Sequence, residues 1–294
     1  MWGREKRFDL ISEPRIAAIY FGLMQSGYEY YSAGKAREDI TLWEAWVKMP
    51  VAYDASYFAG ARQVTTGIYP FTPRAAALEM ASFYVDLQNG TYTDAEGCMR
   101  KIYVSGLIKE RELPDFVAWM KDFPKALKNV MECEGFARYL KWEEQGLKQQ
   151  LKVQRQKLQK YDDALTYFAK KYNPPASNAA VVYCPLKCTF ATDYLTENET
   201  LYAIAGVLRL DAALHEYLHY MLKPFIAKHA DAVTALRNIL RLRIEGANPL
   251  DKSDQAKLSA FEEYAVRELF ALVEDNKYKV ELDKFLPSLL KTLM

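Results

Sequence analysis

Residues 211–224 read Asp-Ala-Ala-Leu-His-Glu-Tyr-Leu-His-Tyr-Met-Leu-Lys-Pro, and this stretch decides how the C-terminal part of the chain folds. Its pattern predicts an amphipathic helix that begins near Asp211 and stops at Pro224. His215 and His219 are four residues apart, so a helix places them on one face, one turn from each other. Two imidazoles at that spacing can bind one zinc ion, whose bonds to nitrogen are about 2.0–2.1 Å long.

Glu216 directly follows His215 and lies about 100° further round the helix. From there its carboxylate can reach a metal-bound water without occupying a coordination position, as the general base does in His-Glu-x-x-His zinc hydrolases. The chain has only three histidines, and two of them are in this motif. The alternative is an ordinary helix that carries two histidines. We expect Asp211 to be the helix N-cap, or else to orient the His215 ring.

A catalytic zinc site needs a third protein ligand. The longer metzincin motif is excluded, because Leu222 and Phe225 stand where it requires glycine and histidine. His229 is a weak candidate, since it lies ten residues after His219 and beyond the proline. The stretch 261–270, Phe-Glu-Glu-Tyr-Ala-Val-Arg-Glu-Leu-Phe, is the stronger source, because it offers two adjacent glutamates on a predicted helix.

With these residues the chain resembles the gluzincins, in which His-Glu-x-x-His is completed by a glutamate from a later helix. It is most similar to a group of bacterial gluzincin-like proteins. In these, proline follows the second histidine by five residues and the later helix reads Glu-x-x-Val-Arg, which correspond here to Pro224 and residues 263–267. The resemblance covers residues of about 160 to 294. It implies a zincin-like fold, a bound zinc ion and the activity of a zinc metallopeptidase.

Two glutamates compete for the third ligand position. The Glu-x-x-Val-Arg match selects Glu263, whereas a second gluzincin pattern, glutamate followed by any residue, an aromatic residue and alanine, selects Glu262. A helical wheel also places Glu262 between Val266 and Leu269, where an unpaired carboxylate would be costly. We favour Glu263 and keep Glu262 as the alternative. Both could instead be solvated helix charges.

The resemblance implies that Glu216 acts as general base in peptide hydrolysis. Arg267 and Tyr264, with Tyr220, are the local candidates for stabilising the oxyanion. The segment Leu201–Val207 is predicted to be the sheet edge along which an extended peptide pairs. Two other functions remain open: a zinc hydrolase of non-peptide amides or esters, and a zincin-like binding or regulatory protein with a structural or vestigial metal site.

The rest of the chain divides at residues 173–178, Asn-Pro-Pro-Ala-Ser-Asn, where a helix cannot continue. Upstream the pattern is helical, and downstream short strands precede further helices. We therefore predict a mostly helical α+β fold, with a helical region at 1–172 and a zincin-like domain at 173–294 that holds a small mixed sheet and the active-site helix. Predicted helices are 73–87, 115–130, 134–171, 231–243, 254–273 and 280–293, and predicted strands are 179–183, 189–194 and 201–207.

The 294 residues are 50% hydrophobic and 26% charged, which is typical of a globular protein with a sizeable core. The net charge of +1 gives no electrostatic case for binding nucleic acid or an acidic membrane. No apolar run reaches the roughly 20 residues that span a bilayer, and four cysteines are too few for a disulfide scaffold. We expect a cytoplasmic protein with a peptide or protein substrate. The sequence does not indicate the oligomeric state.

Overall fold

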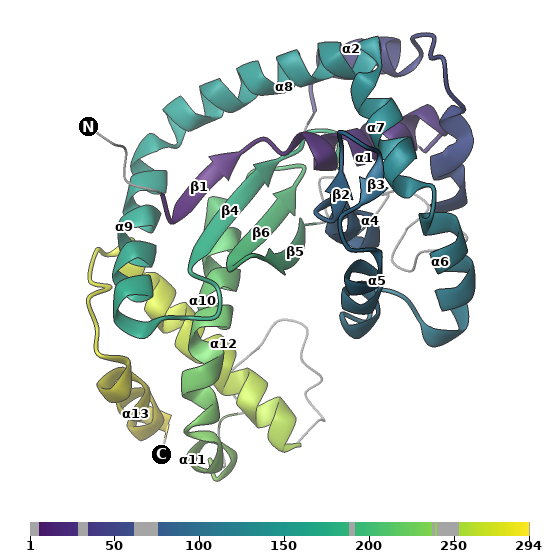
Figure 1. The fold of residues 1–294 in the computed structure, drawn as a ribbon. Coiled ribbons are helices and arrows are strands. Elements are labelled where there is room, and N and C mark those ends of the chain that lie inside the picture. Colours follow the sequence, from purple (N-terminus) through teal and green to yellow (C-terminus); the bar gives the residue numbers. More distant parts are fainter. Residues whose placement is uncertain are drawn as a thin grey trace.

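A four-stranded mixed sheet lies at the centre of the molecule, with helices on both faces (Figure 1). The structure, a computed structural model, describes residues 6–28, 35–61, 76–187, 192–236, 239 and 253–293. Across the sheet the strands are β1 (Phe8–Ile11), β4 (Asn178–Tyr183), β6 (Thr200–Ala205) and β5 (Thr192–Glu197). The first three are parallel, and β5 is an antiparallel edge strand. The predicted α+β fold with a small mixed sheet is confirmed.

In the sequence, one group of elements lies between β1 and β4, and a second group of helices follows β6. The earlier elements are α1 (Pro14–Gln25), α2 (Arg37–Val47), the 3-10 helix η1 (Ala55–Gly60), α4 (Ala76–Ser82), the hairpin β2 (Val85–Asp86) and β3 (Thr91–Tyr92), α5 (Ala95–Val104), η2 (Glu110–Glu112), α6 (Leu113–Met120), α7 (Phe123–Glu132), α8 (Glu134–Val153) and α9 (Arg155–Tyr172). The later helices are α10 (Leu210–Ala227), α11 (Ala230–Thr234), α12 (Asp254–Glu274) and α13 (Leu282–Leu293). Within the described ranges, no helix combines the length and apolar composition that crossing a bilayer requires.

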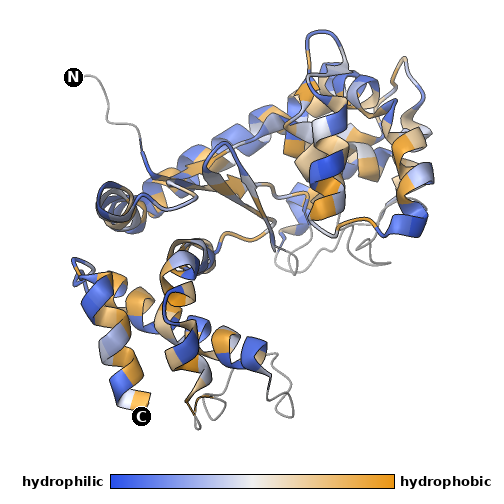
Figure 2. Ribbon diagram, turned by 60° about the horizontal axis from the view of Figure 1, so that its bottom comes forward, coloured by the Kyte–Doolittle hydropathy of each residue, from blue (hydrophilic) through white to orange (hydrophobic). Residues whose placement is uncertain are grey.

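Alternate side chains of the sheet face two different hydrophobic cores. Leu10, Val181 and Ala203, which are aligned across β1, β4 and β6, pack with α9, α10, α12 and α13. On the opposite face, Val182 and Ile204 pack with α1, α7 and α8. The helices are striped with hydrophilic and hydrophobic residues (Figure 2), as amphipathic packing on a sheet requires. The N-terminal helices therefore pack directly on the sheet that precedes α10.

Both segments of the predicted two-part division contribute to the sheet and to the core beneath it. Strand β1, which the sequence pattern did not predict, pairs in parallel with β4, with Phe8 opposite Ala179. Helix α9 contributes Tyr161 and Leu165 to the core that also contains the buried residues of α10 and α12. Residues 1–172 thus supply a strand and a helix to the layer that surrounds the candidate site.

Two predictions about the motif helix are wrong. Helix α10 continues past Pro224, because burial of Leu222 and Ile226 stabilises its last turn despite the backbone hydrogen bond that proline cannot make. The N-cap is Arg209, and Asp211 lies in the first turn, where its charge interacts favourably with the helix dipole. The motif itself is in the middle of a helix, as predicted.

The strands differ from the prediction in one respect that matters for substrate binding. The segment predicted as the sheet edge is β6, and this prediction is wrong because β6 lies between β4 and β5. The cause is a tight turn at Asn198 and Glu199, which returns the chain so that β5 takes the outer position. Helix α12 at Asp254–Glu274 matches the predicted 254–273. The predicted helix 73–87 is α4 followed by β2, and most of the predicted helix 231–243 beyond α11 lies outside the described residues.

Candidate metal centre

Helix α10 holds the two motif histidines at the border of the core. Its buried residues recur in pairs, one pair each turn, so that His215, Glu216 and His219 share the half-buried side. The two imidazole rings are 4.9 Å apart, and their Nε2 atoms are separated by 3.2 Å. The half-buried side of α10 therefore presents both Nε2 atoms to the same point. The opposite, buried face packs into the core and is formed by Ala213, Leu214, Tyr217, Leu218, Met221 and Leu222.

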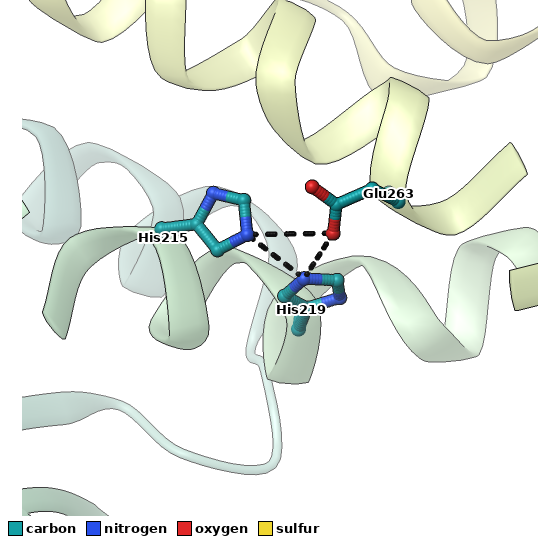
Figure 3. A group of neighbouring side chains, drawn as sticks. All are labelled: His215, His219 and Glu263. Atoms are coloured by element: carbon teal, nitrogen blue, oxygen red, sulfur yellow. Dashed lines mark hydrogen bonds and ion pairs between the residues drawn. The ribbon is translucent and has the colours of Figure 1, made fainter. Parts of the chain in front are cut away.

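Helix α12 packs against α10 and brings Glu263 to the same point (Figure 3). Its Oε2 atom lies 3.2 Å from Nε2 of His219 and 3.5 Å from Nε2 of His215. The side chains are only 17–26% exposed. Among the described residues, these three form the one group of histidine, cysteine and acidic side chains close enough to share a metal ion.

The spacing of these donors suits a tetrahedral ion. Zinc bonds of about 2.0–2.1 Å place the ligand atoms of a tetrahedral site about 3.3 Å apart. The three distances between Nε2 of His215, Nε2 of His219 and Oε2 of Glu263 are 3.2, 3.2 and 3.5 Å. Two imidazoles and one carboxylate are also the donor set of catalytic zinc sites that leave a fourth position for water. The residues therefore fit zinc in both chemistry and spacing.

Glu262 has a different position from its neighbour. Its Oε1 atom lies 2.7 Å from Nδ1 of His219, on the side of the ring away from Glu263. Because a carboxylate only accepts hydrogen bonds, Nδ1 must carry the proton, which leaves the Nε2 lone pair free for a metal. A carboxylate behind a histidine in this way fixes the ring orientation in many metal sites. The two glutamates that the sequence offered as alternatives thus face different atoms: Glu263 faces the Nε2 atoms, and Glu262 faces Nδ1 of His219.

Arg267 supports Glu263 from the next turn of α12. Its Nε atom donates a hydrogen bond of 2.6 Å to Oε1 of Glu263, the oxygen that does not face the histidines. Burial alone would raise the pKa of Glu263, but Arg267 and the two histidines outweigh this effect and the pKa is lowered. Arg267 is therefore placed to orient the carboxylate and keep it ionised.

Negative charge surrounds His219. Burial lowers its pKa, but the hydrogen bond that its ring donates to Glu262 and the charges of Glu262, Glu216 and Glu263 raise it by more, so that the pKa is raised overall. Three carboxylates next to two imidazoles favour a positive charge at this point. A divalent cation would supply that charge and compete with protons for the same nitrogens.

Glu216 lies beside the histidines and faces open space. Together with His215 it lines a cavity of about 290 Å³, which Arg209, Asp211 and Phe270 also border. Burial raises the pKa of Tyr194 on β5 to about 12, and the charge of Glu216 adds to the effect. A carboxylate next to the possible metal position and accessible to solvent can exchange protons with a water held there.

The remaining sequence candidates are outside this cluster. Tyr264 packs against the core that contains α10 and α12, and His229 is the N-cap of α11. Tyr220 lines a second cavity, beneath β5. The sequence did not indicate that Tyr194 lines this cavity together with Tyr220, because β5 was only weakly predicted. The alternation of its side chains across the strand is the signal that could have identified it.

No family model matches the chain, and no curated protein or solved structure is similar enough to count as a match. The assignment to the gluzincins stays a prediction based on the two sequence motifs.

Proposed function

We propose that the chain is a zinc-dependent metallopeptidase. In this proposal His215, His219 and Glu263 bind the metal, and Glu216 is the general base. The observation that carries it is the set of three donor atoms, 3.2–3.5 Å apart, next to a solvent-accessible glutamate. A cytoplasmic location, expected from the sequence, stays a prediction.

The protein residues have distinct roles in this mechanism. A zinc ion bound there would supply a water with a pKa of about 7 and a Lewis acid for the substrate carbonyl. Glu216 accepts a proton from the attacking water and delivers it to the leaving amine. Glu262 holds the ring of His219 through Nδ1, and Arg267 holds the carboxylate of Glu263, so that the donor atoms stay in position before metal arrives.

An extended peptide is the substrate class that the surroundings favour. Among the described strands β5 is an edge of the sheet, and its Tyr194 lines a cavity together with Tyr220, which lies one turn of α10 from Glu216. A sheet edge next to a catalytic site can bind a substrate through main-chain hydrogen bonds, which recognise peptides of many sequences. This edge replaces the one that the sequence analysis assigned to Leu201–Val207.

The test begins with metal content. Purified protein should contain about one zinc per chain by mass spectrometry, and changing His215 or His219 to alanine should remove it. His229→Ala is the matched control and should retain zinc. Glu216→Gln should also retain zinc but lose cleavage of a mixed peptide library, measured by mass spectrometry of the products.

Each other function gives a different result. Zinc retained by a wild-type protein that cleaves neither peptides nor small esters would support a structural metal in a binding protein. Hydrolysis of esters or simple amides without peptide cleavage would support the non-peptide hydrolase. Wild-type protein with no bound zinc would contradict the proposal altogether.

A further inference from the structure

The free edge of β5 has a defined pattern of exposed backbone groups. Asn198 and Glu199 both have positive φ, 47° and 59°, and join β5 to β6 as a two-residue hairpin turn. Such a turn closes with a hydrogen bond between the flanking residues, here Glu197 and Thr200. Along an antiparallel pair of strands, hydrogen-bonded residue pairs then alternate with residue pairs that do not exchange hydrogen bonds. Every second residue of β5 therefore directs its N–H and C=O away from β6, starting at Thr196.

One end of this free edge is already occupied. The outward-facing residues are Thr196, Tyr194 and Thr192 by this alternation. The carbonyl of Thr196 accepts a hydrogen bond of 2.8 Å from Nζ of Lys101, a side chain of α5. The same ammonium group pairs with Glu197. A peptide that pairs with β5 can therefore use Tyr194 and Thr192, but it meets α5 at Thr196.

A cavity of about 350 Å³ lies at this closed end. It is lined by Tyr194 of β5 and Tyr220 of α10, together with residues of the N-terminal helical region that include Met80 and Leu107. Tyr220 directly follows the metal-site histidine and lies one turn from Glu216, so the cavity adjoins the candidate site. Its volume is at the small end of ligand pockets, which measure about 300–1,000 Å³.

The wall of the cavity is held rigidly. Nζ of Lys187 lies 2.5 Å from Asp193 of β5, 2.6 Å from Glu79 of α4 and 2.6 Å from the hydroxyl of Tyr20 of α1. Lys187 and Glu79 are fully buried. This cluster ties the edge strand to the helix that carries Met80. The closed end is therefore a fixed part of the fold.

We propose that this cavity is the blind end of the substrate cleft, and that the protein removes short fragments from the amino end of peptides. The inference rests on the proposed peptidase function. Antiparallel pairing is the more stable arrangement. Because β5 runs from Thr192 toward Lys101, it places the amino end of the peptide at Lys101. Between Tyr194 and Thr196 there are two residues of strand, about 7 Å, so about two further substrate residues fit before the wall.

The charges at the wall permit this direction. Lys101 alone would repel the α-amino group of a peptide, but its ion pair with Glu197 balances the charge. The side chain of Glu197 is 15% exposed and that of Lys101 is 30% exposed. The shape of the blind end therefore limits how many substrate residues fit beyond the cleavage point. Because its charges are balanced, the blind end accepts either a charged or an uncharged amino end.

The experiment compares free and blocked amino ends. Zinc-loaded wild-type protein is incubated with a set of twelve-residue peptides, and with the same peptides fused at the amino end to a folded carrier protein. We expect cleavage after the first, second or third residue of the free peptides, and at least a tenfold slower cleavage of the fusions. Lys101→Ala should open the end and reduce that ratio to less than threefold.

Lys128→Ala is the matched control for Lys101→Ala. Lys128 also donates to a backbone carbonyl, that of Gln88, and its side chain is 31% exposed, but it is on α7 and does not line the cavity. Lys128→Ala should leave the ratio of cleavage rates for free and fused peptides unchanged. If Lys101→Ala does not fold, as judged by its thermal melt, the cleavage positions of the wild type still decide the question.

The outcomes separate this inference from the proposed function. Internal cleavage, with fusions cut as fast as free peptides, would overturn the blind end while the peptidase function stands. Trimming from the carboxyl end would also overturn it. A zinc-loaded wild type that cleaves no peptide would contradict the peptidase function, and the inference with it.

Discussion

Replacing Glu262 and Glu263 by glutamine, one at a time, tests the arrangement of the metal site most directly. Glu262 lies 2.7 Å from Nδ1 of His219, which is within the range of a charge-assisted hydrogen bond. Hydrogen bonds to charged groups contribute about 1.5–3 kcal/mol. Loss of a carboxylate behind a metal-bound histidine typically lowers metal affinity about 10–100-fold, or about 1.4–2.7 kcal/mol. The two estimates agree, so Glu262→Gln should weaken zinc binding about 10–100-fold.

Glu263→Gln should have a larger effect, because it replaces the anionic atom that we propose as a ligand. We expect a loss of zinc affinity greater than about 100-fold, beyond the range of a supporting carboxylate. Competition with a chromogenic chelator at neutral pH measures all the affinities on one scale. Glu268→Gln is the control, since Glu268 is an exposed residue of the same helix. A larger loss for Glu262→Gln than for Glu263→Gln would refute the assignment, as would values for both variants equal to the control.

Three further predictions concern the fold that supports the site. Lys187→Met leaves two buried carboxylates without their cation and should lower the free energy of unfolding by about 3–5 kcal/mol in urea titration. The control Lys277→Met, at an exposed lysine, should change it by less than about 0.5 kcal/mol. Similar losses in the two variants would show that the buried cluster has no stabilising role. Burial raises the pKa of Glu143 to about 7, whereas the unfolded state releases this proton near pH 4.3. The folded state therefore binds the proton more tightly, and the free energy of unfolding should fall by up to about 3 kcal/mol as the pH rises from about 4.3 through 7. Glu143→Gln should remove this component, and the prediction fails if urea titrations at pH 5 and pH 8 give the same difference for both proteins. Pro224→Ala restores a backbone N–H inside α10 and should raise the free energy of unfolding by up to about 3 kcal/mol, seen as a higher melting temperature. A lower melting temperature would mean that the proline ring itself packs favourably.

The sequence predicted the two site helices well and favoured Glu263 over Glu262 by a motif match, but it could not assign a position to each glutamate. Helical periodicity identifies α10 and α12 because each carries apolar residues at regular spacing over five or more turns. Glu262 and Glu263 differ by about 100° around the same helix. Which of them faces the histidines depends on how α12 is rotated against α10, and that rotation is set by packing of the whole core. The structure supplies that rotation: Glu263 faces Nε2 of both histidines, and Glu262 faces Nδ1 of His219.

Contacts between distant segments were the part that periodicity could not supply. Strand β1 has only four residues, and its partner β4 begins at Asn178. Lys187 stands in a short loop after β4 and carries no pattern that distinguishes a buried lysine from an exposed one. Its partners Glu79 and Asp193 come from α4 and β5. The closed end of β5 arises from the same kind of contact, since Lys101 belongs to a helix that precedes the strand by about 90 residues.

The pairing of Phe8 with Ala179 has a consequence for how the protein is made in the cell. Ribosomes extend a chain at about 5–20 residues per second, so β1 is synthesised roughly 10–30 s before β4 exists to pair with it. During that interval the apolar side chains of Phe8 and Leu10, both fully or nearly fully buried in the finished fold, remain in water. A nascent chain in this state is a natural client for chaperones that bind hydrophobic segments. The three residues of the proposed metal site, His215, His219 and Glu263, can likewise come together only late in synthesis, after α12 has left the exit tunnel.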